Sequence, residues 1–347
     1  MKSILFIFLG VVLASLAWQI EEPSLPTHFP PPVYSNENSN QVNALRELGR
    51  ILFYDPILSR DSTISCASCH SPYHAFAHSD HALSHGIDDR IGHRNAPALF
   101  NLAWQRNLMW DGAINHPEVQ ALAPIENHNE MDEDLNHVIQ KMSNSAFYPE
   151  LFATAFGDEQ ITGERLLKAI SSFQLTLVSA NSKYDRVIAG IDEFTDQESR
   201  GYELFLANCI SCHQEPLFST YEYGWNGLPI DDELHDLGRM QITANPSDSL
   251  HFKIPSLRNL KYTSPYMHDG RFRKLSQVLD HYTQIPSGQL KRKGANAQKI
   301  ELNNYQKTDL ISFLQTLNDS AFVFNAENAF PEFLLQKIKT DNILSDK

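Results

Sequence analysis

Basic residues are scarce in this chain of 347 residues, which has 28 lysine and arginine residues against 42 aspartate and glutamate residues. The formal net charge at pH 7 is therefore −14. Nucleic-acid binding depends on cationic side chains that neutralise phosphates, so this composition argues against a nucleic-acid partner. The acidic charge suits a basic protein partner, although solubility alone explains it equally well.

Long hydrophobic runs are also rare, and the one that stands out lies at the N-terminus. Lys2 precedes an apolar stretch over residues 4–13, and Ser15-Leu16-Ala17 follows as a cleavage site with small residues at its first and third positions. This pattern predicts a secretory signal peptide over residues 1–17, because the apolar stretch is too short to span a bilayer. No cysteine follows directly, which argues against a bacterial lipid anchor. A proline-rich polar segment over residues 18–37 predicts an extended arm on the surface.

The chain has only four cysteines, and all of them belong to two copies of the pattern C-x-x-C-H. The copies comprise Cys66, Cys69 and His70, and Cys209, Cys212 and His213. This pattern is typical of c-type haem attachment, in which two thiols bond to the porphyrin vinyl groups and the adjacent imidazole binds the iron. A redox-active dithiol and a four-cysteine zinc site are alternatives, but neither needs a histidine directly after both pairs. We therefore predict two covalent c-type haems.

Haem attachment and the predicted signal peptide support each other. Because c-type haem is attached outside the bacterial cytoplasm, a protein that carries it must be exported, and we predict a periplasmic location. Four cysteines in an exported protein would ordinarily indicate disulfides. Here the two haems account for all four thiols.

Strand signals are sparse, and the spacing of apolar residues predicts a mainly α-helical fold with long loops. Helices are expected from about residue 40, over about residues 163–180 and over about residues 304–317. Thr195 and Glu198 form a capping-box pattern, which predicts a further helix that ends at the second C-x-x-C-H copy.

The two halves of the chain repeat one another. A P-x-L-x-N pattern and an Asp-Gly pair follow each C-x-x-C-H copy in the same order, as Pro97-x-Leu99-x-Asn101 with Asp111-Gly112 and as Pro255-x-Leu257-x-Asn259 with Asp269-Gly270. This recurrence predicts duplication of a one-haem domain. We expect an N-terminal haem domain over residues 38–185, a C-terminal haem domain over residues 186–325 and a tail over residues 326–347.

Together these patterns resemble the bacterial di-haem cytochrome c peroxidase family, which also contains the MauG-type enzymes. The resemblance covers nearly all of the chain after the predicted signal peptide, and it is carried by residues 58–70, 94–97, 109–112, 124–126 with 130–131, 252–259 and 265–270. It implies two cytochrome-c-like domains with the haems near the domain interface. It also implies that peroxide reacts at the N-terminal haem, whose proximal ligand is His70. The C-terminal haem, bound by His213, then passes electrons.

The resemblance assigns further residues. Glu130 matches the family's acid beside the reactive iron, where a carboxylate can take a proton from one peroxide oxygen and return it to the other. Trp110 matches a tryptophan that relays electrons between the haems. Asn95, Thr263 and Pro265 match an interdomain calcium site made of one side-chain oxygen and two backbone carbonyls. Each assignment has an ordinary alternative. Glu130 could be an exposed loop residue, Trp110 could be a buried core aromatic, and the three residues of the calcium site could be loop residues without a ligand.

The second haem departs from the peroxidase pattern at its other axial ligand. The peroxidases of the family have a methionine at the position that Tyr282 occupies here, and tyrosine at this place resembles the MauG-type branch. A phenolate stabilises higher iron oxidation states, whereas methionine raises the haem potential. Tyr282 is our predicted ligand, and His281 and Met267 are neighbouring alternatives.

The first haem also departs from the pattern. The peroxidases carry a histidine that covers the resting iron, but none of His74, His78, His81, His85 and His93 stands at the family spacing. His85 precedes a glycine, as in the family, yet it lies too far from Arg94. We therefore expect an open first haem and histidines that are mostly solvated, with His85 as an alternative ligand.

Three functions remain in view. The first is a di-haem peroxidase that reduces hydrogen peroxide with electrons from a small soluble cytochrome or similar donor. The second is a MauG-type oxidase that uses peroxide to oxidise a protein or small substrate, which Tyr282 favours. The third is a di-haem electron carrier that turns nothing over. The resemblance also allows a homodimer, and no membrane span is expected after signal cleavage.

Overall fold

The structure is a computed structural model that describes residues 25–35, 42–286, 288–292, 295–296 and 299–332. The predicted signal peptide, both ends of the predicted arm and the end of the tail lie outside these residues. The chain divides into one unit up to Pro30 and a second from Pro31 onward. In the first, the described residues form a turn in which the Phe29 amide donates to the Pro26 carbonyl.

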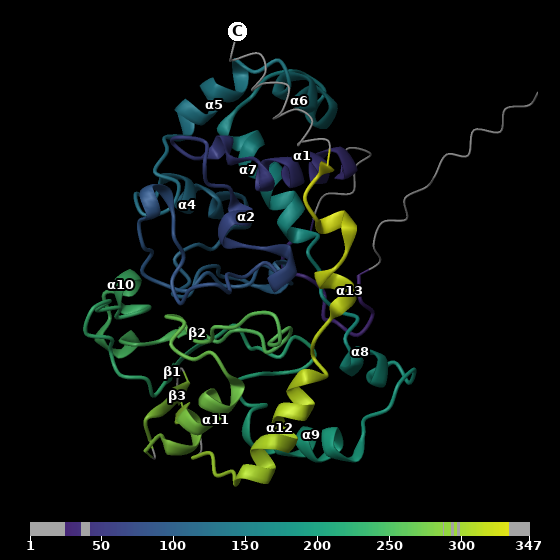
Figure 1. The fold of residues 1–347 in the computed structure, drawn as a ribbon, viewed down its shortest axis with the longest axis vertical. Coiled ribbons are helices and arrows are strands. Elements are labelled where there is room, and N and C mark those ends of the chain that lie inside the picture. Colours follow the sequence, from purple (N-terminus) through teal and green to yellow (C-terminus); the bar gives the residue numbers. More distant parts are fainter. Residues whose placement is uncertain (1–24, 36–41, 287, 293–294, 297–298, 333–347) are drawn as a thin grey trace, which may run out of the picture. The chain divides into compact units, whose positions relative to one another are not determined.

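The predicted helical character is confirmed (Figure 1). The helices of the first half are α1 (Val42–Tyr54), α2 (Cys66–Cys69), α3 (Pro117–Gln120), α4 (Leu122–Glu126), α5 (Leu135–Ser143), α6 (Tyr148–Phe156), α7 (Gly163–Leu175) and α8 (Lys183–Ile188). Those of the second half are α9 (Asp196–Asn208), α10 (Met240–Thr243), α11 (Leu275–Gln284), α12 (Asn304–Gln315) and α13 (Ser320–Val323). Short 3₁₀ turns lie at Pro56–Leu58, Pro72–His74, Ile87–Asp89, Leu102–Trp104, Pro246–Asp248 and Ala326–Asn328.

The four helices expected from the sequence are present. Thr195 is the N-cap of α9, where its hydroxyl accepts from the Glu198 amide while the Glu198 carboxylate accepts from the Thr195 amide. This reciprocal pair satisfies two helix-end donors, as the sequence pattern predicted. The α7 helix is shorter than expected, because it ends at Leu175 and the chain then turns at Thr176.

Each half is built on one close helix pair, α1 with α7 and α9 with α12, which Figure 1 shows side by side. A side chain at Gly49 of α1 would lie 1.9 Å from the Ala169 carbonyl oxygen of α7. A side chain at Gly201 of α9 would lie 2.0 Å from the Asp309 carbonyl oxygen of α12. Only glycine fits at either crossing, so the two pairs share one packing geometry.

The same repetition appears in the aromatic core of each half. Three buried phenylalanines pack with ring centroids 5.3, 5.7 and 6.2 Å apart in the first half and 5.2, 5.4 and 6.2 Å apart in the second. They are Phe53, Phe76 and Phe173, and Phe205, Phe218 and Phe313. Because both triads bridge the helix pair and the loop after C-x-x-C-H, the duplicated motif sits on a duplicated core.

The two P-x-L-x-N segments meet at one residue, Ser179. Asn101 and Asn259 both have left-handed backbone geometry, with φ of 55° and 63°. The Asn101 side chain donates to the Ser179 carbonyl and accepts from the Ser179 amide, at 3.1 and 2.9 Å. The Asn259 side chain donates to the Ser179 hydroxyl at 2.9 Å. The equivalent asparagines therefore tie the linker between the halves to both of them.

A small antiparallel sheet, which the sequence did not predict, lies in the second half. Its strands are β1 (Tyr223–Asn226), β2 (Phe252–Lys253), β3 (Leu290–Arg292) and β4 (Ala295–Asn296), in the order β2-β1-β3-β4. Tyr223 pairs with Lys253, and Trp225 pairs with Lys291. Strands of two to four residues are too short to show an alternating pattern, which explains why they were missed.

The C-terminal chain returns to the first half. Phe322 and Val323 of α13 belong to the same buried cluster as Phe76. The Tyr54 hydroxyl donates to the Asn328 carbonyl at 2.7 Å, and the Tyr54 ring packs on Phe330. Phe333 lies outside the described residues. Within the described ranges, no helix is both long and apolar enough to cross a membrane.

Candidate functional site

The first C-x-x-C-H copy forms a single turn, α2, with its histidine held in place. The His70 amide donates to the Cys66 carbonyl at 2.9 Å, and Nδ1 of His70 lies 2.9 Å from the Phe76 carbonyl oxygen. A hydrogen bond at Nδ1 leaves Nε2 as the nitrogen that can bind iron. Burial lowers the pKa of His70 to about 4, so its imidazole is neutral at ordinary pH, as a metal ligand must be.

The second copy repeats this arrangement. The His213 amide donates to the Cys209 carbonyl at 2.9 Å, and Nδ1 of His213 lies 3.2 Å from the carbonyl oxygens of both Phe218 and Pro255. Burial lowers the pKa of His213 to about 4 as well. Pro255 opens the second P-x-L-x-N segment, and Pro97 of the first segment contributes the matching hydrogen bond to His70. Each proline carbonyl thus orients one imidazole.

The cysteines fit covalent haem attachment better than redox chemistry. None of the four takes part in a disulfide. Burial raises the pKa of Cys66 to about 12, that of Cys69 to about 11 and that of Cys209 to about 12. A redox-active dithiol needs a lowered pKa, because the thiolate is the reactive form. With a neutral imidazole beside each pair, the donor sets fit two c-type haems.

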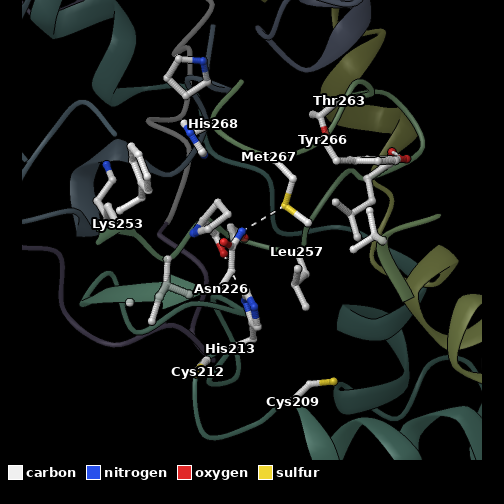
Figure 2. A pocket seen from close by; sticks show the side chains of 18 of the residues that line it. Cys209, Cys212, His213, Asn226, Lys253, Leu257, Thr263, Tyr266, Met267 and His268 are labelled. Carbon is white, nitrogen blue, oxygen red and sulfur yellow. Dashed lines mark hydrogen bonds between the residues drawn. The ribbon is translucent and has the colours of Figure 1, made fainter. Parts of the chain in front are cut away.

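A cavity of about 270 Å³ opens above the second copy (Figure 2). Cys209, Cys212 and His213 line it from the second half of the chain, and Trp110 and Asn95 line it from the first half. Most of the remaining lining is apolar, including Leu257, Leu279 and Leu314 among its aliphatic residues. An apolar cavity with convergent polar groups is the usual form of a cofactor site.

Three residues were predicted as alternative axial ligands at this cavity, and the structure separates them. Tyr282 lines the cavity, where burial raises its pKa and the neighbouring Cys212 and Cys209 raise it further. Met267 also lines the cavity, and its sulfur accepts from the Asn226 side chain at 3.4 Å. Nε2 of His281 lies 2.9 Å from the Asn226 carbonyl oxygen, outside the cavity lining. Tyr282 and Met267 therefore border the cavity, whereas His281 does not.

Trp110 borders the same cavity. Its indole Nε1 donates to the Asn95 carbonyl at 2.8 Å, and its own carbonyl accepts from the Lys253 amide at 2.7 Å. Ala77, the residue after the carbonyl that holds His70, lines the cavity as well. The indole is thus fixed next to chain segments from both C-x-x-C-H copies.

Glu130 lies beside the first copy. Its carboxylate accepts from the Asn127 side chain at 2.7 Å, and its carbonyl accepts from the Ile87 amide at 2.8 Å. Burial raises the pKa of Glu130, although the Asn127 hydrogen bond opposes the rise. The Glu130 charge contributes to the raised pKa of Cys66 and of Cys69, which places the carboxylate close to both thiols. A carboxyl group with a raised pKa can act as base and acid in turn.

The histidines of the following loop form a row. His78 and His81 stack at 5.9 Å, and His81 and His85 stack at 4.5 Å between centroids. Nδ1 of His85 lies 2.6 Å from an Asp89 carboxylate oxygen, so this nitrogen is engaged by the protein. The expectation of solvated histidines fits His81, which is exposed, but not His78, which is half-buried beside His70.

The residues predicted to bind calcium all border the cavity. Asn95, Thr263 and Pro265 line it, and the Asn95 amide group donates to the Ala82 carbonyl at 2.9 Å. This bond leaves the side-chain oxygen of Asn95 as a remaining acceptor. In the described part of the chain, no cluster of three or more His, Cys, Asp or Glu side chains is arranged to hold a metal ion. A calcium site here would depend on amide and carbonyl oxygens.

Sequence reasoning missed Lys253 as a feature of this site. Its side chain lines the cavity next to Trp110, and burial lowers its pKa to about 7. A lysine within a short apolar segment gives no sequence signal of this kind, because its environment is set by residues about 150 positions earlier in the chain.

The fold and the paired C-x-x-C-H sites define a di-haem c-type cytochrome, and comparisons with known proteins agree. The family described as "Di-haem cytochrome c peroxidase" matches residues 43–193, and the family described as "Cytochrome c" matches residues 198–318. A methylamine utilization protein MauG from Methylophilus methylotrophus is 34% identical over 338 residues, which cover 94% of this chain and 98% of that protein. The chain therefore belongs to the di-haem cytochrome c peroxidase family, which includes the MauG proteins. The prediction of two c-type haem domains is confirmed.

Other relatives support the same placement. A cytochrome c551 peroxidase from Nitrosomonas europaea is 33% identical over 330 residues, which cover 91% of this chain and 90% of that protein. Among solved structures, a MauG-like protein associated with microbial copper homeostasis has a TM-score of 0.77 and 30% identity, and the match covers 90% of this chain and 99% of that one. The di-haem peroxidase BthA from Burkholderia thailandensis has a TM-score of 0.71 at 22% identity, which shows a shared fold.

Proposed function

We propose that the chain is a periplasmic di-haem peroxidase that reduces hydrogen peroxide to water with electrons from a small soluble cytochrome or similar donor. The observation that carries the proposal is the difference between two sites built on one scaffold. Glu130 lies close to both cysteines of the first C-x-x-C-H copy, whereas Tyr282 lies close to both cysteines of the second. An acid–base residue suits a reacting site, and a further axial ligand suits an electron-transfer site.

The proposal gives each half one task. When bound, the haem of the first half would supply the iron at which peroxide is reduced, and Cys66, Cys69 and His70 would hold it. Glu130 takes a proton from one peroxide oxygen and returns it to the oxygen that leaves. Two electrons and two protons from outside then complete the conversion of one peroxide to two waters.

Electrons enter at the second half. Cys209, Cys212 and His213 hold the haem there, and Trp110 provides the path toward the first half. The position of Trp110 supports this role, because its indole is fixed by the Asn95 carbonyl at a cavity that segments from both halves border. With Cys66 and Cys69, these residues make up the proposed site.

The surroundings of the enzyme are also part of the proposal. The signal peptide over residues 1–17 directs the chain to the periplasm, and the net charge of −14 favours a donor with a basic surface. A calcium ion bound by Asn95, Thr263 and Pro265 would join the haem domains at residues 38–185 and 186–325. Family analogy alone supports a homodimer, which the molecular mass in solution would test.

A second candidate function is a MauG-type oxidase, and Tyr282 is the observation that favours it. A tyrosine ligand holds a haem at low potential and stabilises its oxidised states. Such a haem accepts electrons poorly from a high-potential cytochrome and is better suited to share oxidising equivalents with the first haem. The product would then be an oxidised protein or small molecule.

One experiment separates these functions. Purified protein with two haems, counted by the pyridine haemochrome assay, is mixed with peroxide and then with reduced cytochrome c. Rapid cytochrome oxidation supports the peroxidase. A long-lived near-infrared absorption with slow cytochrome turnover supports the oxidase. A protein that does not respond to peroxide and has no high-spin signal at rest is an electron carrier, and the proposal is then wrong.

A further inference from the structure

Lys253 is held at the wall of the cavity by Trp110 and its neighbours. Its backbone amide donates to the Trp110 carbonyl at 2.7 Å. Its ammonium group donates to the Gln105 side-chain oxygen at 2.6 Å and to the Asn107 carbonyl at 3.1 Å. Both acceptors are neutral, and an ammonium has three N–H groups, so one donor is left over.

Within the part of the chain that the structure describes, no carboxylate lies within ion-pair distance of the Lys253 nitrogen. Asp111 acts on it from longer range. One oxygen of the Asp111 carboxylate already accepts from Arg94 at 2.6 Å, and the other accepts from the Ala113 amide at 3.0 Å. Asp111 therefore does not serve as the direct counter-ion of Lys253.

Two other buried or half-buried cations differ from Lys253, because each has a carboxylate partner. Arg258 binds the Asp185 carboxylate through two nitrogens at 2.7 and 2.8 Å. Lys141 binds Glu133 at 2.6 Å. A charge taken out of water is stable only when it is paired, because desolvation otherwise favours the neutral form. Burial accordingly lowers the pKa of Lys253 to about 7. This lysine is placed to receive an anion that the described part of the chain does not provide.

The cofactor of this cavity carries such anions. A c-type haem has two propionate groups, and they extend from the porphyrin edge opposite to the one that bonds to the cysteines. In Figure 2, Lys253 lies on the side of the cavity away from Cys209. The propionate edge of a porphyrin attached to these cysteines would therefore face the side of the cavity on which Lys253 lies.

We propose that Lys253 binds a propionate carboxylate of the haem attached through Cys209 and Cys212, next to Trp110. Lys253 is then a positioning residue, because it holds one negatively charged propionate of this haem next to Trp110. The ammonium keeps its bonds to Gln105 and Asn107 and gives its third N–H to the carboxylate. This inference rests on the two haems of the proposed function.

The test uses the complete two-haem protein with Lys253→Met, Lys253→Arg and, as a matched control, Lys261→Met at an exposed lysine. Spectroelectrochemical titration gives the potential of each haem. Loss of the cation leaves the carboxylate uncompensated, which favours the ferric state. We expect Lys253→Met to shift the ferric–ferrous equilibrium of the second haem by about tenfold toward ferric, ~59 mV for a one-electron couple. Lys253→Arg and Lys261→Met should leave it within a few-fold of the parent.

A second measurement uses the parent protein, so the inference stays testable if Lys253→Met does not fold. Resonance Raman spectra in H₂O and D₂O report on hydrogen bonds to propionates, and we expect a deuterium-sensitive propionate mode that Lys253→Met removes. An unshifted second-haem potential in Lys253→Met, a shift confined to the first haem, or equal shifts in Lys253→Met and Lys253→Arg would overturn the inference. Propionate modes that have the same frequencies in H₂O and in D₂O would also overturn it. A haem count below two would instead overturn the proposed function.

Discussion

Glu130→Gln is the substitution that tests the proposed chemistry most directly. Glutamine has nearly the same volume and keeps an oxygen that can accept the Asn127 hydrogen bond of 2.7 Å, so the local structure should remain. What it loses is the ability to take up and release a proton. General acid–base catalysis typically contributes a factor of about 10²–10⁴. We expect the rate constant for the reaction with peroxide to fall by that factor, which corresponds to about 2.7–5.4 kcal/mol in activation free energy.

The pH profile of the same reaction gives a second signature. Burial raises the pKa of Glu130. The carboxylate form is needed to accept the first proton, so the parent rate should fall as the pH drops through the pKa of Glu130. This pKa lies above the value of about 4.3 that is usual for glutamate. The Glu130→Gln enzyme should lack this acidic limb. Stopped-flow mixing with peroxide across a pH series measures both the rate and its profile.

Glu126→Gln is the matched control, since Glu126 is an exposed glutamate at the end of α4. It should react at the parental rate. The mechanism is wrong if Glu130→Gln retains the parental rate constant and the acidic limb while both variants carry two haems. An equal loss in both variants would also refute it, because the effect would then reflect the net charge of the loop.

Three further predictions concern the second haem, the relay and the core. Tyr282→Phe should alter the resting low-spin spectrum while Met267→Leu preserves it, and the reverse pattern would assign the ligand to Met267. Trp110→Phe should slow reduction of the first haem by the second in stopped-flow experiments without slowing the reaction with peroxide; an unchanged transfer rate would exclude the relay. Arg258→Met should cost about 3–5 kcal/mol in unfolding free energy, measured by denaturant titration, because it removes the cation that binds the buried Asp185 carboxylate through two hydrogen bonds. Burial alone would raise the pKa of Asp185, but Arg258 lowers it to about 2, so the stabilising effect should be full above the unfolded pKa of about 3.9 and fade toward pH 2.

The haem-binding sites could be predicted from the sequence because their chemistry is local. Two cysteines and a histidine within five residues form one turn, and the hydrogen bond from the His70 amide to the Cys66 carbonyl joins residues only four apart in the chain. The capping box at Thr195 is local in the same sense. The repeat could also be predicted, because Asn101 and Asn259 occupy the same position of the P-x-L-x-N pattern in the two halves. The structure adds that both asparagines have left-handed backbone geometry.

The residues around the haem sites could not be found this way, because their environment comes from distant segments. The neutral hydrogen-bond partners of Lys253 are Gln105 and Asn107, which lie nearly 150 residues earlier in the chain. Ser179 looks like an ordinary linker residue, yet it receives the equivalent asparagines of both halves. The burial of His78 beside His70 likewise depends on how the loop folds back. Spacing within a short motif cannot encode such contacts.

The duplicated surroundings of the two haem-binding histidines limit which residues can make the two haems differ in function. His70 is held at Nδ1 by the Phe76 carbonyl with help from Pro97, and His213 is held by the Phe218 and Pro255 carbonyls. Hydrogen bonds at this nitrogen tune the basicity of the ligating imidazole. Because they are equivalent, the proximal side should contribute nearly the same to both potentials. A measured difference between the two haem potentials would then come mainly from groups other than these hydrogen bonds, such as Glu130 beside the first copy and Tyr282 beside the second.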